Sequence, residues 1–180
     1  MLEGRNVNLR IAEKEDIPLF TDWWNSLEVI GDYELFPQMS KAEMEKQIEK
    51  WSSQPSPFDT KVFIIEKKDE SKIGYIGHRP VGRSQELGYA ILPSERKKGY
   101  CSESVMIMVD YLFLSKDIVR VQAQTDPRNL ASQKVLEKAG FKKEGILRRN
   151  FFQRGEWKDA YIYSILREEW KEPKILTKTA

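Results

Sequence analysis

A short basic loop carries the clearest chemical signal in the chain. It is segment 92–102, which reads Leu-Pro-Ser-Glu-Arg-Lys-Lys-Gly-Tyr-Cys-Ser and joins an expected strand to an expected apolar helix. A helix start leaves backbone N–H groups unpaired and carries a partial positive charge. Gly99 lets a ligand approach the backbone closely. Full charges come from Arg96, Lys97 and Lys98, so the loop is a candidate anion site, best suited to phosphate.

The loop matches neither a Walker A sequence nor the G-x-G-x-x-G dinucleotide fingerprint. Taken alone, it is equally well explained as a basic connection between two elements. A second segment, 129–141, reads Asn-Leu-Ala-Ser-Gln-Lys-Val-Leu-Glu-Lys-Ala-Gly-Phe and follows one strand later. Asn129 and Gly140 stand where a helix would start and end.

Together the two segments resemble the signatures of the GNAT acyltransferase family. Residues 96–101 are similar to the R/Q-x-x-G-x-G/A motif, which in that family binds the pyrophosphate of acetyl-CoA. Residues 129–141 are similar to the N-x-x-S-x-x-x-x-E-K-x-G-F form, which is typical of the branch resembling the RimJ/RimL-type N-terminal acetyltransferases of ribosomal proteins. Glu144-Gly145, Trp157-x-Asp159 and Tyr161 also sit as they do in that branch, so the resemblance covers nearly the whole chain.

The resemblance implies an acetyl-CoA-dependent N-acetyltransferase that moves the acetyl group directly to a primary amine. A protein or peptide N-terminus is the expected acceptor, and a small amine (a polyamine, an aminoglycoside or an amino sugar) is the alternative. A GNAT-like module that binds acyl-CoA without turnover is a third possibility. The protein is expected to be a monomer or a homodimer and to use no metal ion.

The resemblance also places the pantetheine arm beside the strand that ends at Leu92, with backbone N–H groups there, most of all that of Ile91, facing the thioester carbonyl. The expected cofactor contacts lie on this strand end, on the basic loop and at the start of the second helix. They are Ala90, Ile91, Leu92, Arg96, Lys97, Lys98, Gly99, Tyr100, Cys101, Ser102, Asn129 and Ser132.

Cys101 departs from the family motif, which usually has Gly or Ala at this position. Because a helix N-terminus lowers the pKa of a thiol, an acyl-cysteine route is conceivable. Direct transfer is preferred, because the family uses it and no base lies nearby in the sequence.

Transfer to an amine needs a base, since alkyl amines are mostly protonated at neutral pH. Glu86 is the first candidate, because alternation places it on the same side of its strand as Ala90. The competing interpretation is an exposed glutamate paired with a neighbouring Lys or Arg. Asp159, Glu34 and His78 are weaker candidates.

The leaving thiolate needs a proton, and many relatives carry a tyrosine for it where this chain has Leu136. Ser132, one helical turn after Asn129, is the catalytic alternative that the N-x-x-S branch suggests. A hydrogen bond from Ser132 to the cofactor or to the helix backbone is its competing role. Asn129 is expected to fix the pantetheine amide, although an ordinary N-cap is equally compatible with its position.

The acceptor pocket of the family lies between the first two helices and the last hairpin. Aromatic side chains in these regions are candidates for its lining, although packing explains most of them. They are Trp23, Trp24, Tyr33, Phe36, Phe151 and Phe152. Glu28, Asp32 and Glu34 predict a modestly acidic entrance, with a solvated charged loop as the equal alternative.

Hydrophobic periodicity predicts the elements that position these residues. Strands are expected at 7–11, 61–66, 72–81, 86–92, 118–124, 141–150 and 157–166, and helices over 17–24, after Ser40, at 102–114 and at 129–139. The order β-α-α-β-β-β-α-β-α-β-β predicts an α/β (α+β) fold. We expect a single GNAT-like domain over 1–170, with a mixed, mostly antiparallel sheet flanked by helices, and a loosely ordered tail at 171–180.

Composition excludes several other classes of protein. The 30 Lys and Arg residues are balanced by 28 Asp and Glu and interspersed with them, so nucleic acid is not an expected partner. One Cys and one His exclude an internal disulfide and a zinc site built on these residues. No apolar run approaches the roughly 20 residues of a membrane span, and the N-terminus has no signal-peptide shape. These features predict a soluble, cytoplasmic protein.

Overall fold

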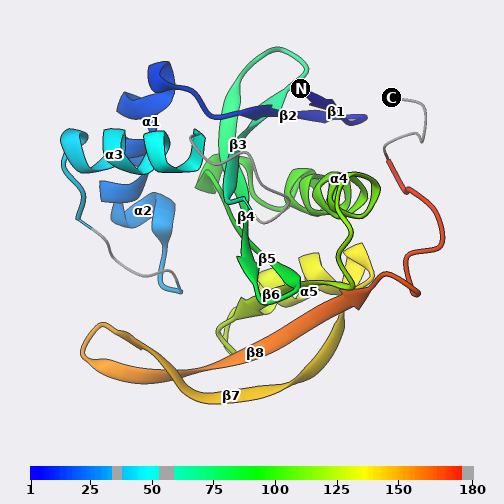
Figure 1. Ribbon diagram of the computed structural model, residues 1–180. Coiled ribbons are helices and arrows are strands. Elements are labelled where there is room, and N and C mark those ends of the chain that lie inside the picture. The colour runs from blue at the N-terminus through cyan, green and yellow to red at the C-terminus, as the bar shows by residue number, and fades with distance from the viewer. Residues whose placement is uncertain (34–37, 53–58, 176–180) are drawn as a thin grey trace.

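An eight-stranded sheet forms the centre of the molecule, in the order β1-β2-β3-β4-β5-β6-β8-β7 (Figure 1). The computed structural model describes residues 1–33, 38–52 and 59–175. The strands are β1 (Leu2–Glu3), β2 (Val7–Ile11), β3 (Lys61–Lys67), β4 (Lys72–Val81), β5 (Ser84–Ile91), β6 (Arg120–Thr125), β7 (Lys142–Gln153) and β8 (Glu156–Leu166). Only β5 and β6 pair in parallel within this sheet, which confirms the predicted mixed, mostly antiparallel fold.

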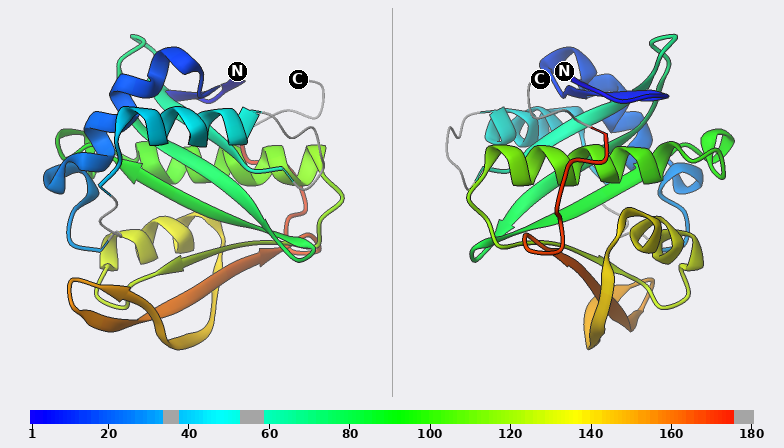
Figure 2. Two further views of the ribbon diagram at one scale, coloured as in Figure 1. Left: turned by 60° about the vertical axis from the view of Figure 1, so that its left-hand side comes forward. Right: turned by 90° about the vertical axis from the view of Figure 1, so that its right-hand side faces the viewer.

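Helices cover both faces of the sheet. They are α1 (Ile17–Asn25), α2 (Leu27–Ile30), α3 (Lys41–Ser52), α4 (Tyr100–Ser115) and α5 (Leu130–Ala139), with short 3-10 turns η1 (Lys14–Asp16) and η2 (Pro93–Glu95). The first three helices lie on one face, and α4 and α5 lie on the other (Figure 2). At the start of α3, the Glu43 N–H donates to Ser40 Oγ while the Ser40 N–H donates to Glu43, so a capping box begins the helix after Ser40, as expected.

The two faces carry separate hydrophobic cores because the strands are buried on both sides. Along β3, Phe63 and Ile65 pack with α4, while Ile64 between them packs with α1 and α3. On α4, buried apolar side chains extend around most of the helix, as its sequence predicts. No helix in the described part of the chain is long and apolar enough to cross a membrane.

Several boundaries differ from the predicted ones. β1 and α2 are so short, at two and four residues, that neither leaves a periodic pattern. The last hairpin is tighter than expected, because only Arg154 and Gly155 form its turn, both with positive φ (51° and 81°). Its polar flanking residues, Gln153 and Glu156, therefore belong to the strands.

The buried carboxylate of Asp110 on α4 binds the segment that follows β8. It accepts hydrogen bonds from Trp170 Nε1 at 2.9 Å, from the Lys174 N–H at 2.9 Å and from the Ile175 N–H at 2.7 Å. Residues 171–175 of the expected loose tail are therefore attached to α4. Residues 176–180 lie outside the described part of the chain.

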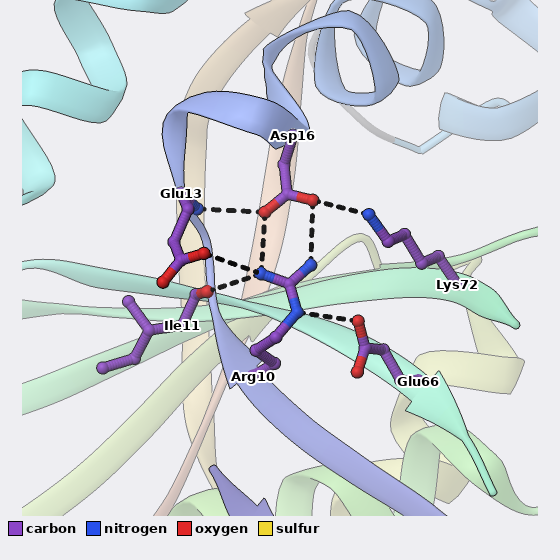
Figure 3. Close-up of polar contacts among 6 residues, drawn as sticks. All are labelled: Arg10, Ile11, Glu13, Asp16, Glu66 and Lys72. Carbon is purple, nitrogen blue, oxygen red and sulfur yellow. Dashed lines mark hydrogen bonds and ion pairs between the residues drawn. The ribbon is translucent and has the colours of Figure 1, made fainter. Parts of the chain in front are cut away.

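A charged cluster attaches the start of the helical layer to the sheet (Figure 3). Arg10 on β2 donates to both oxygens of Asp16, at 2.8 and 3.0 Å, and its Nε donates to Glu66 on β3 at 2.8 Å. Lys72 on β4 donates to the same Asp16 at 2.8 Å. Burial alone would raise the pKa of Asp16, but donation from Arg10 and Lys72 lowers it to about 2.

Candidate active site

The two parallel strands β5 and β6 part in the middle of the sheet. They pair only from Ser84–Leu87 to Arg120–Ala123, while β5 continues beside β4 to Ile91. We call the point after Leu87 and Ala123 the fork. The Leu92 N–H donates to Ile73 on β4 at 2.8 Å, so alternation turns the Ile91 N–H away from β4, toward the side that β6 has left. This direction is the one that the predicted thioester contact requires, and the contact itself stays a prediction.

The basic loop that follows β5 has a backbone shaped for an anion. Lys97 and Gly99 both have positive φ (63° and 88°), and α4 begins directly afterwards at Tyr100. Its first bond runs from the Glu103 N–H to the Gly99 carbonyl, at 3.1 Å. The preceding N–H groups of the helix thus lack an intrahelical acceptor, and Gly99 has no side chain to cap them. Successive N–H groups in such a turn favour an anion.

The cations of this loop have different roles. Arg96 donates to the Ile91 carbonyl at 3.2 Å and to the Val29 carbonyl at 3.0 Å, so it braces the loop against β5 and α2. Lys98 pairs with Glu95 at 3.1 Å. Beside Lys98 and Gly99, a cavity of about 270 Å³ at the start of α4 is lined by residues that include Arg5 and Lys138.

Cys101 lies in the first turn of α4, where burial raises the pKa of its thiol to about 12. Burial is the cause of this shift, and it acts against the lowering expected from the helix N-terminus. At neutral pH the thiol is protonated, which argues against the acyl-cysteine route.

Glu86 is buried beside the fork, with 7% of its surface exposed. One carboxylate oxygen accepts from Arg79 of the neighbouring strand, and the other accepts from Gln122 Nε2 and Gln124 Nε2, both at 2.9 Å. Gln124 accepts in turn from Asn150 Nδ2 on β7 at 2.5 Å. The competing interpretation of Glu86 as an exposed residue is therefore wrong, although the pairing with an arginine that it predicted is present. The sequence did not indicate the two glutamines or Asn150.

The other base candidates are placed differently. His78 is buried under α4 between Phe63 and Tyr111, and burial lowers its pKa to about 4. Asp159 accepts from the Arg149 N–H at 2.8 Å on the last hairpin. Glu34 lies outside the described residues.

Ser132 and Asn129 occupy the start of α5. The Ser132 N–H donates to Asn129 Oδ1 at 3.1 Å, so Asn129 is an N-cap. Ser132 Oγ lies 2.9 Å from Tyr89 Oη on β5. Sequence reasoning missed this tyrosine, although alternation from Leu87 would have placed it on the α5 face. Leu136, at the position of the usual tyrosine, is fully buried in the core.

On the expected acceptor side, one acid of the predicted entrance is paired with an arginine. Arg154, at the tip of the β7–β8 hairpin, donates to the Gly31 carbonyl at 3.0 Å and pairs with Asp32 at 3.3 Å. The guanidinium of Arg128 lies 5.7 Å from the ring centre of Tyr33. The predicted acidic entrance is thus partly neutralised at Asp32.

The predicted aromatic lining divides into core and surface residues. Trp23 and Trp24 pack with Phe20 and Tyr75 inside the smaller core, in agreement with the packing interpretation. Phe152 is exposed and contacts Trp157 on the hairpin, with ring centres 5.7 Å apart. Phe36, another predicted lining residue, lies outside the described residues.

Comparison with known proteins agrees with this arrangement. A family profile described as the acetyltransferase (GNAT) domain matches residues 6–142. The chain is 29% identical to an uncharacterized N-acetyltransferase, p20, of Bacillus licheniformis, over 94% of this chain and 97% of that protein.

Two solved structures share the fold. The spermidine N-acetyltransferase of Vibrio cholerae, in complex with CoA and spermine, has a TM-score of 0.80 at 21% identity, over 93% of this chain and 99% of that one. RimL, a ribosomal L7/L12 alpha-N-protein acetyltransferase in complex with coenzyme A, has a TM-score of 0.82 at 19% identity, over 94% and 98%. The same fold therefore serves acceptors of two kinds.

Proposed function

The chain belongs to the GNAT acetyltransferase family and is an N-acetyltransferase that uses acetyl-CoA, and from this premise we propose that its acceptor is the N-terminal amine of a protein or peptide. The observation that carries this proposal is the pairing of Asp32 with Arg154 at the rim. A polyamine presents several ammonium groups, and a carboxylate already matched by an arginine attracts them weakly. The exposed Phe152 and Trp157 offer apolar contact area to a peptide chain.

The geometry supports direct transfer of the acetyl group. The anion-shaped backbone at Lys97 and Gly99 suits the pyrophosphate, and the Ile91 N–H has the direction needed at the pantetheine arm or thioester. Glu86, held by three donors beside the fork, takes the amine proton through water. The neutral amine attacks the thioester carbonyl, its nitrogen loses a second proton to solvent as the amide forms, and the thiolate leaves. Most of the rate advantage comes from holding the two reactants in position.

Thiol release measures this function directly. Purified protein, acetyl-CoA and a panel of short peptides with free N-termini should release CoA, and the same peptides with blocked N-termini should not. Spermidine is the competing acceptor and is tested in parallel. Faster release with spermidine than with every peptide would overturn the proposed acceptor, while leaving the acetyltransferase assignment intact.

A further inference from the structure

Tyr89 and Ser132 form a hydroxyl pair that connects β5 to α5 where β5 and β6 have parted. Their oxygens lie 2.9 Å apart and both residues are partly buried. Tyr89 is set by the strand and packs against the larger core, while Ser132 is set by the helix turn that Asn129 caps. Both hydroxyls are therefore held in position before any ligand binds.

The pair lies where the reacting end of acetyl-CoA is expected. With the pyrophosphate at the basic loop after β5, the pantetheine arm runs back along this strand toward the fork at Leu87. Tyr89 stands two residues from the fork, so about 7 Å of strand separates them. The thioester sulfur at the end of the arm is therefore expected beside the two hydroxyls.

The chemistry of the two hydroxyls differs. An aliphatic alcohol is too weak an acid to protonate a thiolate efficiently, whereas a phenol is an acid only slightly weaker than a thiol. A serine that is hydrogen-bonded to a tyrosine can donate its proton to the thiolate, because the tyrosine supplies another proton to the serine oxygen. This arrangement would replace the helix tyrosine that is absent here, because Leu136 occupies its position in the core.

We infer that Ser132 and Tyr89 form a proton relay to the sulfur of the leaving CoA, an inference that rests on the proposed acetyl transfer. As the C–S bond breaks, its electron pair goes to sulfur and the Ser132 proton follows. The Tyr89 proton passes to the Ser132 oxygen, and the tyrosinate regains a proton from solvent. The acceptor nitrogen loses two protons, one toward Glu86 before the attack and one to solvent as the amide forms. The sulfur gains one, so one proton is released overall. Tyr89 acts through Ser132 and is a positioning residue rather than a catalytic one.

Binding of CoA and of desulfo-CoA, measured by calorimetry between pH 7 and 9.5, tests the relay without any acceptor. Hydroxyl donation to a bound thiolate should make CoA bind about tenfold more tightly than desulfo-CoA at the alkaline end of the range. Ser132→Ala should abolish this ratio and Ser132→Thr should retain it. Tyr89→Phe should reduce it at least threefold.

Tyr163→Phe is the matched control. The Tyr163 hydroxyl lies 3.4 Å from Gln133 and 3.3 Å from Glu137 on the same helix, so its removal should leave the ratio unchanged. A Tyr89→Phe variant that keeps the wild-type ratio, or that weakens both ligands equally, would overturn the relay. A ratio that responds as expected supports the relay even if every peptide acceptor fails, so the two proposals fail separately.

Discussion

Glu86 is the proposed base, and three donors fix its carboxylate beside the fork. Glu86→Gln removes the basic oxygen while keeping the size of the side chain. We expect kcat to fall about a hundredfold or more, with little change in the KM for acetyl-CoA. Steady-state thiol release with the best acceptor measures this change.

The control for this variant is Glu144→Gln, since Glu144 bonds Ser164 on the β7–β8 hairpin rather than a group at the fork. It should keep kcat within about twofold of the wild type. If Glu86→Gln also retains wild-type kcat, Glu86 is a structural partner of Arg79, and the base is solvent or another group.

We expect His78 to make the stability of the protein depend on pH. Burial lowers its pKa from 6.5 to about 4, so the folded protein keeps it neutral while the unfolded chain takes up a proton. Its contribution to stability is complete above pH 6.5 and is lost as the pH falls toward 4. The free energy of unfolding should decrease by up to about 3 kcal/mol over this window.

Urea unfolding at several pH values measures this slope, and His78→Gln is the comparison. The variant should be less stable at neutral pH but should lack the extra decrease between pH 6.5 and 4. Parallel curves for the two proteins would show that another group titrates in this range.

At the residue scale, the sequence predicts backbone geometry best where neighbours in the chain form it. The loop at Lys97 and Gly99 and the capped turn at Ser132 are formed by neighbours in sequence, so a motif specifies them. Arg96 was expected to serve the anion, yet one of its acceptors is the Val29 carbonyl, which only the folding of α2 brings near. Tyr89 was missed because its partner lies on an element that the strand pattern does not identify.

At the level of elements, the Arg10–Asp16 cluster joins β2, β3 and β4 to the start of α1. Asp16→Asn leaves two cations facing a neutral side chain in a buried position. We expect a loss of about 2–3 kcal/mol at pH 7 and a Tm lower by about 5–10 °C. Because the pKa of Asp16 is lowered to about 2, its contribution is complete above pH 3.8 and is lost between pH 3.8 and 2.

Glu49→Gln is the matched control, because it breaks the exposed pair of Glu49 with Lys14, whose charged atoms lie 3.0 Å apart. Thermal unfolding followed by circular dichroism should show an unchanged Tm for this variant. A similar Tm for both variants would mean that water solvates the charged groups as well as the Asp16 cluster does. The cluster would then not anchor the helices to the sheet.

Element boundaries were predicted best where both ends carry a local signal. The α5 helix begins after Asn129 and ends before Gly140, as its caps predict. The β7–β8 turn was predicted too long, since its polar strand ends resemble a loop until cross-strand pairing extends them. The attachment of residues 171–175 depends on Asp110, far away in the sequence, and no local pattern could reveal it.

At the scale of the whole molecule, the fold was predictable because the hydrophobic periods of helices and strands alternate along the chain. Few sheet topologies accommodate the resulting order of elements. The order of the strands in the sheet was harder to predict from the sequence. The parallel pairing of β5 with β6 ends at Leu87 and Ala123, and it needs a crossover connection between the two strands, which α4 supplies. The basic loop and the start of α5 both contact β5, the loop through Arg96 and Ile91 and the helix through Ser132 and Tyr89, so binding at this place should stabilise the entire fold.

Ligand binding to the folded state alone raises the free energy of unfolding by mass action. Acetyl-CoA at about a hundred times its Kd should add roughly 2.7 kcal/mol, which corresponds to a Tm higher by about 5–10 °C, and ATP at the same concentration should add little. Gly99→Ala strains the backbone of the basic loop, where residue 99 has a φ of 88°. It should raise the Kd for acetyl-CoA about tenfold and remove about 1.4 kcal/mol of the stabilisation.

Gly82→Ala separates the loop from the general cost of a positive φ. Gly82 has a φ of 58°, and as at Gly99, a side-chain carbon there would meet no atom within 4 Å. It lies in the β4–β5 turn, so the variant should lose stability without ligand yet keep the full acetyl-CoA shift in differential scanning fluorimetry. Equal shifts in the two variants would place the cofactor phosphates away from Gly99, and the positive φ there would then serve only the turn into α4.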